Sequence, residues 1–210
     1  MKKYSLTNVT KEFFGITLFQ IKAEISFGSV VKGELGGFIE KKENLSEDGN
    51  AWVSGNARVS GNALVYGNAQ VSGNARVYGN AWVSGDALVS GDAQVYGNAL
   101  VYGNAQVYGN ARVYGNAWVS GNAQVSGNAW FSGNALVYAK ASFTKGFFIG
   151  GDDTGKINDI TEKTGSDYWK HQYVLGDYEI TPLEDEKETS LKGKKVKFEL
   201  DGKTCTATID

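Results

Sequence analysis

The chain has 210 residues, of which 41% are hydrophobic, and a formal net charge of −2, which suits one extended domain or a repeat domain with a small additional module. This charge balance favours neither a nucleic acid nor a membrane surface as partner. A single cysteine, Cys205, excludes an internal disulfide, and no apolar run approaches the roughly eighteen residues of a membrane span. Because the N-terminus lacks the apolar stretch of a secretory signal, the sequence predicts a cytoplasmic protein.

Residues 1–49 are predicted to form an N-terminal β cap. Two β-like runs, 17–21 and 23–27, are followed by a glycine-rich segment over 31–40. Residues 44–49 look like a degenerate copy of the repeat that follows, with Glu47 in the place of a core valine. A cap is expected here because the open end of a stack of strands exposes unpaired backbone groups.

From Asn50 to Ala139 one six-residue motif, Asn/Asp-Ala-x-Val-Ser/Tyr-Gly, recurs fifteen times without interruption. A hexapeptide period is typical of a parallel β-helix, and with three six-residue sides to a triangular coil the fifteen sides predict five coils. Side chains alternate along an extended segment, so Ala and Val of each side should fill the interior. The Gly-Asn pairs supply the backbone angles that corners require, and stacked Asn side chains should form ladders.

The start of the chain resembles a known family. The segments 17–23, 32–40 and 43–46, running into 49–53, are similar to the N-terminal signature of YdcK-type hexapeptide-repeat proteins, which bacteria and phages carry. The resemblance covers about residues 4–145. It implies a left-handed parallel β-helix, whereas labels used in the family, such as acyltransferase or polymer-forming protein, are analogies that the fold alone does not support.

Beyond Ala139 the repeat phase continues, because Ala141 and Phe143, then Phe147 and Ile149, fall where the next Ala and Val pairs are expected. The remaining part, 152–210, is predicted to be a small acidic α+β or β-rich module that closes with a hairpin at Asp201-Gly202. We therefore expect a mainly-β protein of three parts: an N-terminal cap over 1–49, a β-helix of five to six coils over 50–151, and the C-terminal module over 152–210.

Outward residues eighteen apart stack on the same side of the coil, so the repeat predicts three faces. The Gln/Ser face carries Trp52, Gln70, Leu88, Gln106 and Gln124 with Ser54, Ser72, Ser90, Tyr108 and Ser126. The Arg/Tyr face carries Arg58, Arg76, Gln94, Arg112 and Trp130 with Ser60, Tyr78, Tyr96, Tyr114 and Ser132. The Leu/Trp face carries Leu64, Trp82, Leu100, Trp118 and Leu136 with Tyr66, Ser84, Tyr102, Ser120 and Tyr138.

The Leu/Trp face is the candidate protein interface. Large apolar patches are unusual on the surface of a monomer, and Trp and Tyr are the residues that anchor interfaces. The alternative is that these aromatic and branched side chains only stabilise the strands by packing against each other. The alternation of large and small residues is confined to this face, which favours the interface.

The Arg/Tyr face is a candidate site for an anion or an acidic partner, formed by Arg58, Arg76 and Arg112 with Tyr78, Tyr96 and Tyr114. Arg58 and Arg76 should repel each other in adjacent coils unless an anion or a partner's carboxylates cover them. Arg interleaved with Tyr also resembles a surface for single-stranded nucleic acid, but three Arg in an acidic chain favour a solvated face over that reading.

The sequence does not predict an enzyme. Hexapeptide acyltransferases use a histidine base in the coils or in an inserted loop, whereas no histidine or insertion occurs between Asn50 and Ala139. His171, the chain's one histidine, lies among Trp169 and Tyr173 and is best explained as a packed structural residue. One Cys and one His support no metal site, and Asp152, Asp153 and Asp159 are more simply explained as a solvated acidic loop. No cofactor is expected.

These observations predict a non-catalytic scaffold that binds a macromolecule. One specific form is a phage or prophage protein that binds and inhibits a host factor such as a defence nuclease. Two alternatives are a self-assembling homo-oligomer built on the Leu/Trp face and, with less support, an acyltransferase-like enzyme.

Overall fold

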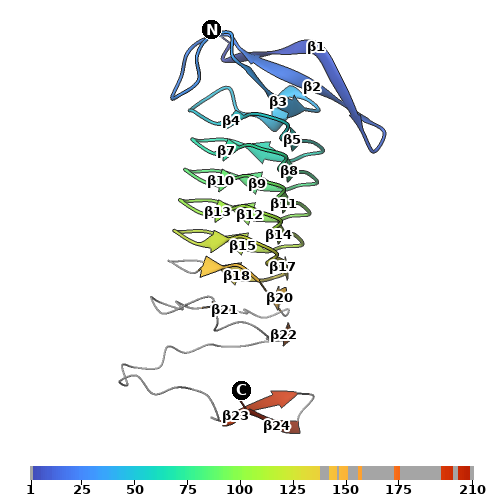
Figure 1. Cartoon of the computed structure of the whole chain (residues 1–210), viewed down its shortest axis with the longest axis vertical. Helices are drawn as coiled ribbons and strands as arrows, with labels where there is room; N and C mark the ends of the chain where they lie inside the picture. Colours follow the sequence, from blue (N-terminus) through green and yellow to red (C-terminus); the bar gives the residue numbers. More distant parts are fainter. Residues whose placement is uncertain are drawn as a thin grey trace. The chain divides into compact units, whose positions relative to one another are not determined.

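The computed structural model describes residues 2–137 and 142–145, together with the strands at 147–150, 156–157, 173–175, 195–200 and 203–208. The chain divides into two compact units, Met1–Ile180 and Thr181–Asp210. The first unit is a stack of coils below an N-terminal cap, and it contains three sheets (Figure 1). Within the described residues there is no α-helix, only a short 3-10 turn at Lys42–Asn44. None of the described helical segments is long and apolar enough to cross a membrane.

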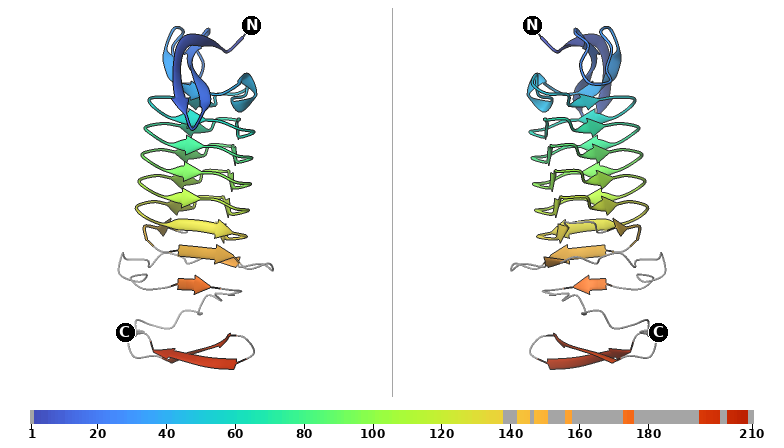
Figure 2. Two further views of the ribbon diagram at one scale, coloured as in Figure 1. Left: turned by 90° about the vertical axis from the view of Figure 1, so that its right-hand side faces the viewer. Right: turned by 90° about the vertical axis from the view of Figure 1, so that its left-hand side faces the viewer.

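The cap begins with an antiparallel hairpin of β1 (Tyr4–Phe13) and β2 (Ile16–Ala23), and β2 pairs in turn with β3 (Leu35–Ile39). Phe14 and Gly15 form the turn, with φ of +49° and +76°. Positive φ at both central residues of a two-residue hairpin loop is the geometry that matches the twist of the strands. Figure 2 shows this hairpin projecting beyond the first coil, along one side of the stack.

Below the cap, the strands of each side pair with those eighteen residues away and form parallel sheets. The Arg/Tyr face lies on the sheet that continues β3 through β5 (Arg58–Val59), β8 (Arg76–Val77), β11 (Gln94–Val95), β14 (Arg112–Val113), β17 (Trp130–Gly133), β20 (Phe147–Gly150) and β22 (Tyr173–Leu175). The Gln/Ser face lies on β4 (Trp52–Val53), β7 (Gln70–Val71), β10 (Leu88–Val89), β13 (Gln106–Val107), β16 (Gln124–Val125) and β19 (Ser142–Phe143). The Leu/Trp face lies on β6 (Leu64–Val65), β9 (Trp82–Val83), β12 (Leu100–Val101), β15 (Trp118–Val119), β18 (Leu136–Val137) and β21 (Lys156–Ile157).

The interior is formed by the two residues that the motif predicts. From Ala51 to Val125 every Ala and Val of the motif is buried, with at most 1% of its surface exposed. Each corner glycine has a positive φ, and a Cβ added at Gly91 would lie 2.9 Å from the backbone nitrogen of Gly109 in the next coil. Glycine is therefore required at the corners both by the left-handed backbone and by the close approach of successive coils. The prediction of a mainly-β parallel β-helix of five to six coils is confirmed.

The solenoid begins two sides before the predicted start at Asn50, and the second of these sides includes the degenerate copy at 44–49. Ile39 pairs with Val59, and Leu45 forms a bridge with Val65, so both residues occupy the place of a core valine. The assignment of Glu47 to that place was wrong: Glu47 is exposed, and its carboxylate accepts a hydrogen bond from the Lys3 amide at 2.7 Å. Six residues separate Ile39 from Leu45 but eight separate Leu45 from Val53, so the first full coil holds two extra residues.

A second register shift follows the regular repeats. Phe143 is buried and pairs with Val125, as expected. In the next side, however, Phe148 pairs with Phe131 and Ile149 with Ser132. Phe148 therefore stands in register with the core position, where Ile149 had been predicted, because this side is one residue shorter than the repeat.

Buried polar side chains join the cap to the first coils. Asn44 is fully buried, and its amide nitrogen donates to the Gly61 and Ala63 carbonyls at 3.0 and 2.8 Å. The Tyr4 hydroxyl lies 2.8 Å from the carbonyl oxygens of both Lys42 and Leu45. Burial, together with the nearby Glu47 and Glu43 carboxylates, raises the pKa of Tyr4 well above its ordinary value. These contacts satisfy backbone groups that the end of a sheet would otherwise leave unpaired.

In the second unit, β23 (Lys195–Leu200) and β24 (Lys203–Thr208) form an antiparallel hairpin. Leu200 pairs with Lys203, so Asp201 and Gly202 are its two-residue turn, as predicted. The α+β or β-rich character expected for the rest of 152–210 concerns residues that lie largely outside the described ranges.

Candidate interaction surfaces

The Leu/Trp face presents its large side chains in one column along the axis. Leu64, Trp82, Leu100, Trp118 and Leu136 are partners in consecutive parallel strand pairs. Trp82 and Trp118 are thus two coils apart, roughly 10 Å, which is twice the strand spacing of about 4.8 Å. The Tyr66 ring packs edge-on against Trp82, with the ring centroids 6.3 Å apart.

The tryptophans of this face are its most accessible side chains. Trp82 and Trp118 are 47% and 44% exposed, and Tyr102 is 40% exposed. Ser84 and Ser120, which follow the core valine in the same coils as the tryptophans, are buried. The outward positions of this face carry no charge from Leu64 to Leu136, and Lys156 of β21 is the register partner of Leu136. Tyr138 lies outside the described residues. The face therefore offers aromatic and aliphatic surface, with small residues beside each tryptophan.

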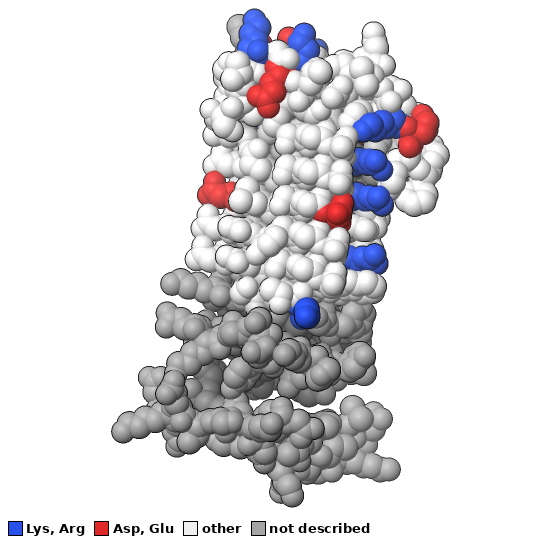
Figure 3. All heavy atoms as spheres, viewed as in Figure 1, with Lys and Arg blue, Asp and Glu red and all other residues white. Residues whose placement is uncertain are grey.

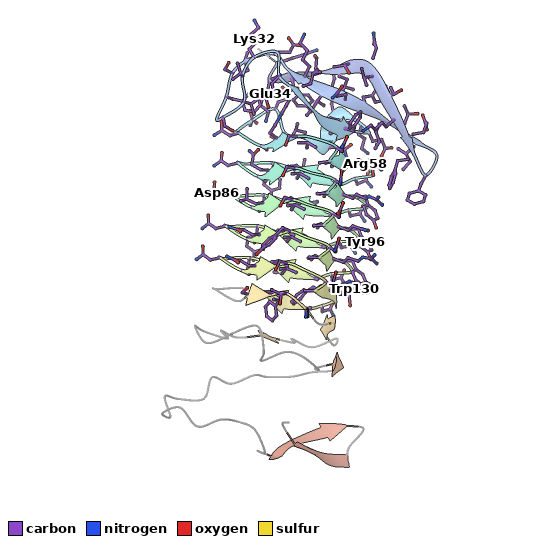
Figure 4. The ribbon with its side chains drawn as sticks, viewed as in Figure 1. Lys32, Glu34, Arg58, Asp86, Tyr96 and Trp130 are labelled. Carbon is purple, nitrogen blue, oxygen red and sulfur yellow. The ribbon has the colours of Figure 1, made fainter. Side chains whose placement is uncertain are left out.

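The Arg/Tyr face carries a column of cations that pack on aromatic rings. The guanidinium carbons of Arg58 and Arg76 lie 4.7 and 4.9 Å from the centroid of the Phe13 ring, which the hairpin of β1 and β2 brings over this sheet. Arg112 lies 4.4 Å from the Trp130 ring in the next coil. Figure 3 shows Lys and Arg aligned along one edge of the stack, and Figure 4 shows Arg58, Tyr96 and Trp130 along that edge.

These contacts explain how adjacent coils tolerate like charges. Arg58 and Arg76 are register partners, and two unit charges 4 Å apart repel by about 1 kcal/mol in water and about 4 kcal/mol near a protein surface. A cation over an aromatic ring gains about 0.5–1 kcal/mol at an exposed site. The shared Phe13 ring therefore offsets part of the repulsion. Across the described part of the chain, no carboxylate forms an ion pair with the three guanidiniums.

Beside the arginines, Tyr78, Tyr96 and Tyr114 form a ladder of stacked rings. The ring centroids are 4.8 and 4.9 Å apart and the planes are parallel within 3°. Burial raises the pKa of the Tyr78 and Tyr96 hydroxyls, an effect that Arg112 opposes at both, so both hydroxyls stay protonated at neutral pH. The faces of the middle ring are covered by its two neighbours, and the ladder presents ring edges and hydroxyls to solvent.

The Gln/Ser face differs from its prediction at Trp52 and at Ser126, which is buried and whose hydroxyl donates to the Phe143 carbonyl at 3.3 Å. Trp52 is not on the surface but 2% exposed, because the cap covers it: its ring packs edge-on against Phe27 at 5.5 Å. A Cβ on Gly36 would lie 2.7 Å from the Trp52 ring, so glycine at that position allows the cap to approach. The Trp52 ring nitrogen is buried without an acceptor among the described residues.

The corners carry amide ladders that the repeat predicted. One corner has an unbroken ladder in which Asn62, Asn80, Asn98 and Asn116 each donate to the asparagine one coil further on, ending at Asn134. Lys41 begins it by donating to Asn62 at 3.0 Å. The other two corners contain Asp86 and Asp92, which accept from Asn68 and Asn74. Within the described coils, neither aspartate bonds to the asparagine that follows it, because a carboxylate has no proton to donate.

The residues considered for catalysis and metal binding can be placed only in part. His171, Asp152, Asp153 and Asp159 lie outside the described residues. Cys205 lies in β24. In the described ranges, no group of three or more His, Cys, Asp and Glu is arranged to hold a metal ion.

Sequence reasoning missed the role of the hairpin that covers the arginines. It did not predict β1, whose last residue, Phe13, contacts both Arg58 and Arg76. Lys11 of the same strand donates to Asn56 at 2.9 Å and lies over the Phe38 ring. The alternation around Phe14-Gly15 was a local signal for a hairpin. The contact of Phe13 with Arg58, however, joins the non-repetitive cap to a distant residue of the repeat.

Comparison with known proteins identifies the repeat. The family model described as YdcK Beta solenoid repeat matches residues 51–67, 57–71, 69–85, 93–105 and 105–121. A comparison with proteins of curated function finds no match.

Proposed function

Because its coils are YdcK-type β-solenoid repeats, as the N-terminal resemblance indicated, we propose that this protein is a non-catalytic scaffold that binds a protein partner through the Leu/Trp face. The observation that carries the proposal is the exposure of Trp82 and Trp118 on a column that carries no charge between Leu64 and Leu136. Burying an exposed tryptophan side chain against a partner is energetically favourable, because apolar surface is removed from water. Tryptophan is also enriched among the residues that contribute most to the binding energy of protein interfaces.

The rigidity of the coils supports this role. The backbone of each coil is hydrogen-bonded to the next, for example from the Trp82 amide to the Ala99 carbonyl at 2.9 Å and from the Leu100 amide to the Ala117 carbonyl at 2.9 Å. The side chains of the column are thus held at fixed spacing before a partner binds. Such preorganisation reduces the entropy lost on association.

A second candidate, a homo-oligomer, uses the same face. Coils with Trp in the first column carry Ser in the second, as with Trp82 and Ser84, and coils with Leu in the first column carry Tyr in the second. A two-fold axis parallel to the solenoid would place Trp82 of one copy opposite Ser84 of the other and Leu100 opposite Tyr102. This interface would be self-complementary, as two-fold symmetry requires.

The test is the double variant Trp82→Glu and Trp118→Glu. We expect it to keep the β-helix, because both positions point outward, and to lose partner capture or the native oligomer. The matched control is Ser72→Glu with Tyr108→Glu, which adds the same charge at the same two-coil spacing on the Gln/Ser face. Light scattering during gel filtration over a tenfold concentration range gives the native mass, and affinity capture reports the partner. Unchanged mass and unchanged capture in the tryptophan variant would contradict the proposal.

A narrower form of the proposal is a phage or prophage protein that binds and blocks a host factor such as a defence nuclease. It is supported by the resemblance to repeat proteins that bacteria and phages carry. The chain, used as bait in lysate from infected cells, is then expected to retain a host protein that the tryptophan variant does not retain. If no host protein is retained, the narrower form fails, whereas the broader one is decided by the native mass.

A further inference from the structure

The Arg/Tyr face has the donors of a binding site for carboxylates. Arg58 and Arg76 each lie against the Phe13 ring, and Arg112 lies against Trp130. In a guanidinium stacked on a ring, the N–H groups at the edge of the plane remain available, and their geometry suits bidentate contacts with a carboxylate. No hydrogen bond from these three side chains to other described residues is present.

Three carboxylates around this face have hydrogen-bond partners of their own. Glu12, beside Phe13 in β1, accepts a hydrogen bond from the Thr17 hydroxyl at 2.6 Å. Glu40 accepts a hydrogen bond from the Gly61 amide at 2.6 Å, and Asp92, at the corner before Gln94, accepts from Asn74 at 3.0 Å. The cationic column of Arg58, Arg76 and Arg112 therefore forms no ion pair with a carboxylate within the described ranges. A partner that brings carboxylates would supply it.

The tyrosine ladder adds donors and limits the class of ligand. The hydroxyls of the ladder can donate to a carboxylate lying along the column. It cannot serve as a stacking platform within the ladder, because the rings are 4.8 and 4.9 Å apart and cover each other's faces. Single-stranded nucleic acid is usually held by bases stacked on free aromatic faces, which this surface offers poorly.

We infer that the Arg/Tyr face binds an extended acidic peptide of a partner protein, running along the solenoid axis from Arg58 to Arg112. Three coils separate these residues, roughly 14 Å at about 4.8 Å per coil. In an extended peptide, side chains at alternate positions lie on one face about 6.7 Å apart. The first and third of three acidic residues at alternate positions are therefore about 13 Å apart. Three carboxylates thus cover the length of the three-arginine column. This inference does not depend on the Leu/Trp face.

The experiment uses the full chain and a fluorescent peptide with Glu at alternate positions, followed by anisotropy at low and at physiological salt. We expect saturable binding that weakens as salt increases, and no binding of the same peptide with Gln in place of Glu. The variant Arg58→Gln, Arg76→Gln and Arg112→Gln should bind at least tenfold more weakly. Its fold should be retained, because Gln94 occupies the same column in the natural chain.

A charge-matched variant separates the site from simple attraction. It combines the three Arg→Gln changes with Gln70→Arg, Gln106→Arg and Gln124→Arg, so that the net charge is kept while the arginines move to the Gln/Ser face. We expect it to bind as weakly as the triple variant, because Phe13 and Trp130 no longer hold the guanidiniums. Binding equal to that of the natural chain would overturn the inference. So would the absence of saturable binding at low salt, or tighter binding of a single-stranded oligonucleotide of equal charge.

Discussion

At the scale of single residues, Tyr4 shows how one polar side chain fixes the start of the solenoid. Its ring is fully buried, and its hydroxyl lies 2.8 Å from the carbonyl oxygens of Lys42 and Leu45. These carbonyls belong to the turn that ends at Leu45, which forms a parallel bridge with Val65 at the start of the sheet beneath the Leu/Trp face. Because ionisation would place a negative charge in this buried environment beside Glu47, the folded protein holds the phenolic proton tightly.

The variant Tyr4→Phe is expected to lower the free energy of unfolding at neutral pH by about 1–2 kcal/mol, because it removes the hydroxyl donor of the Leu45 carbonyl, whereas the Lys42 carbonyl keeps its bond from the Leu45 amide. In the natural chain the pKa of Tyr4 is raised above its ordinary value of 10.0, so its contribution is complete below that pH and is lost as pH rises above it. The variant should therefore lose less stability than the natural chain at alkaline pH.

Urea unfolding at neutral pH and at about pH 11 measures both effects. Tyr108→Phe is the control at neutral pH, because Tyr108 is 37% exposed on the Gln/Ser face and its removal should leave the unfolding midpoint unchanged. An identical decline of stability with pH in Tyr4→Phe and in the natural chain would show that Tyr4 does not carry this dependence.

At the scale of the structural elements, the corners differ in how well their ladders are formed. The ladder from Asn62 to Asn134 is continuous, whereas the other two corners are interrupted at Asp86 and Asp92. An asparagine both donates and accepts, but an ionised aspartate only accepts. Each aspartate therefore receives a bond from the coil before it and gives none to the coil after it. Figure 4 places Asp86 along the edge of the stack opposite Arg58.

Changing Asp86→Asn and Asp92→Asn together is expected to complete both ladders through the middle coils. Each added bond should contribute about 0.5–1.5 kcal/mol, the usual net value for a hydrogen bond, and exposed positions favour the lower end. Thermal unfolding followed by circular dichroism measures the change. Asn98→Asp is the opposite control, since it should interrupt the continuous ladder and lower the midpoint. A double variant no more stable than the natural chain would show that these ladders contribute little.

At the scale of the whole solenoid, the cap closes one end of the coil stack. It covers Trp52 and pairs β2 with β3, the strand at which the parallel part of the longest sheet begins. Removing residues 2–34 would expose Trp52 and leave β3 as an open edge. Open, flat edges pair with other chains, so the shortened protein should form higher oligomers or aggregate, whereas the full chain should not do so to the same extent. Light scattering measures this, and a shortened chain with the native mass of the full one would contradict it.

The interior of the coils could be predicted from the sequence because the same short motif recurs. Ala51 and Val53, and the pairs after them, needed only the alternation of side chains along a strand to be placed inside. The hairpin at Asp201-Gly202 was predictable for a similar reason, since its signal is local.

The ends of the solenoid were harder to predict, because there the period changes. The two extra residues before Val53 move Leu45 into the place assigned to Glu47, and the short side before Phe148 moves the register by one. Neither of these changes in spacing can be recognised from the amino-acid composition of the segment. The packing of Phe13 on Arg58 and of the cap on Trp52 likewise depends on contacts between distant, unique segments, which a repeat motif does not encode.

The strict period also governs how such a chain can change length in evolution. Insertion or loss of eighteen residues, one full coil, keeps the interior and leaves every outward residue on its original face. Insertion or loss of six residues also keeps the Ala and Val interior, yet it rotates all later sides by a third of a turn and moves each onto the next face. After the loss of six residues Trp118 would lie in the arginine column, and after an insertion of six it would lie on the Gln/Ser face. The fold therefore tolerates six-residue duplications that would exchange its surfaces, because the interior depends on the period alone.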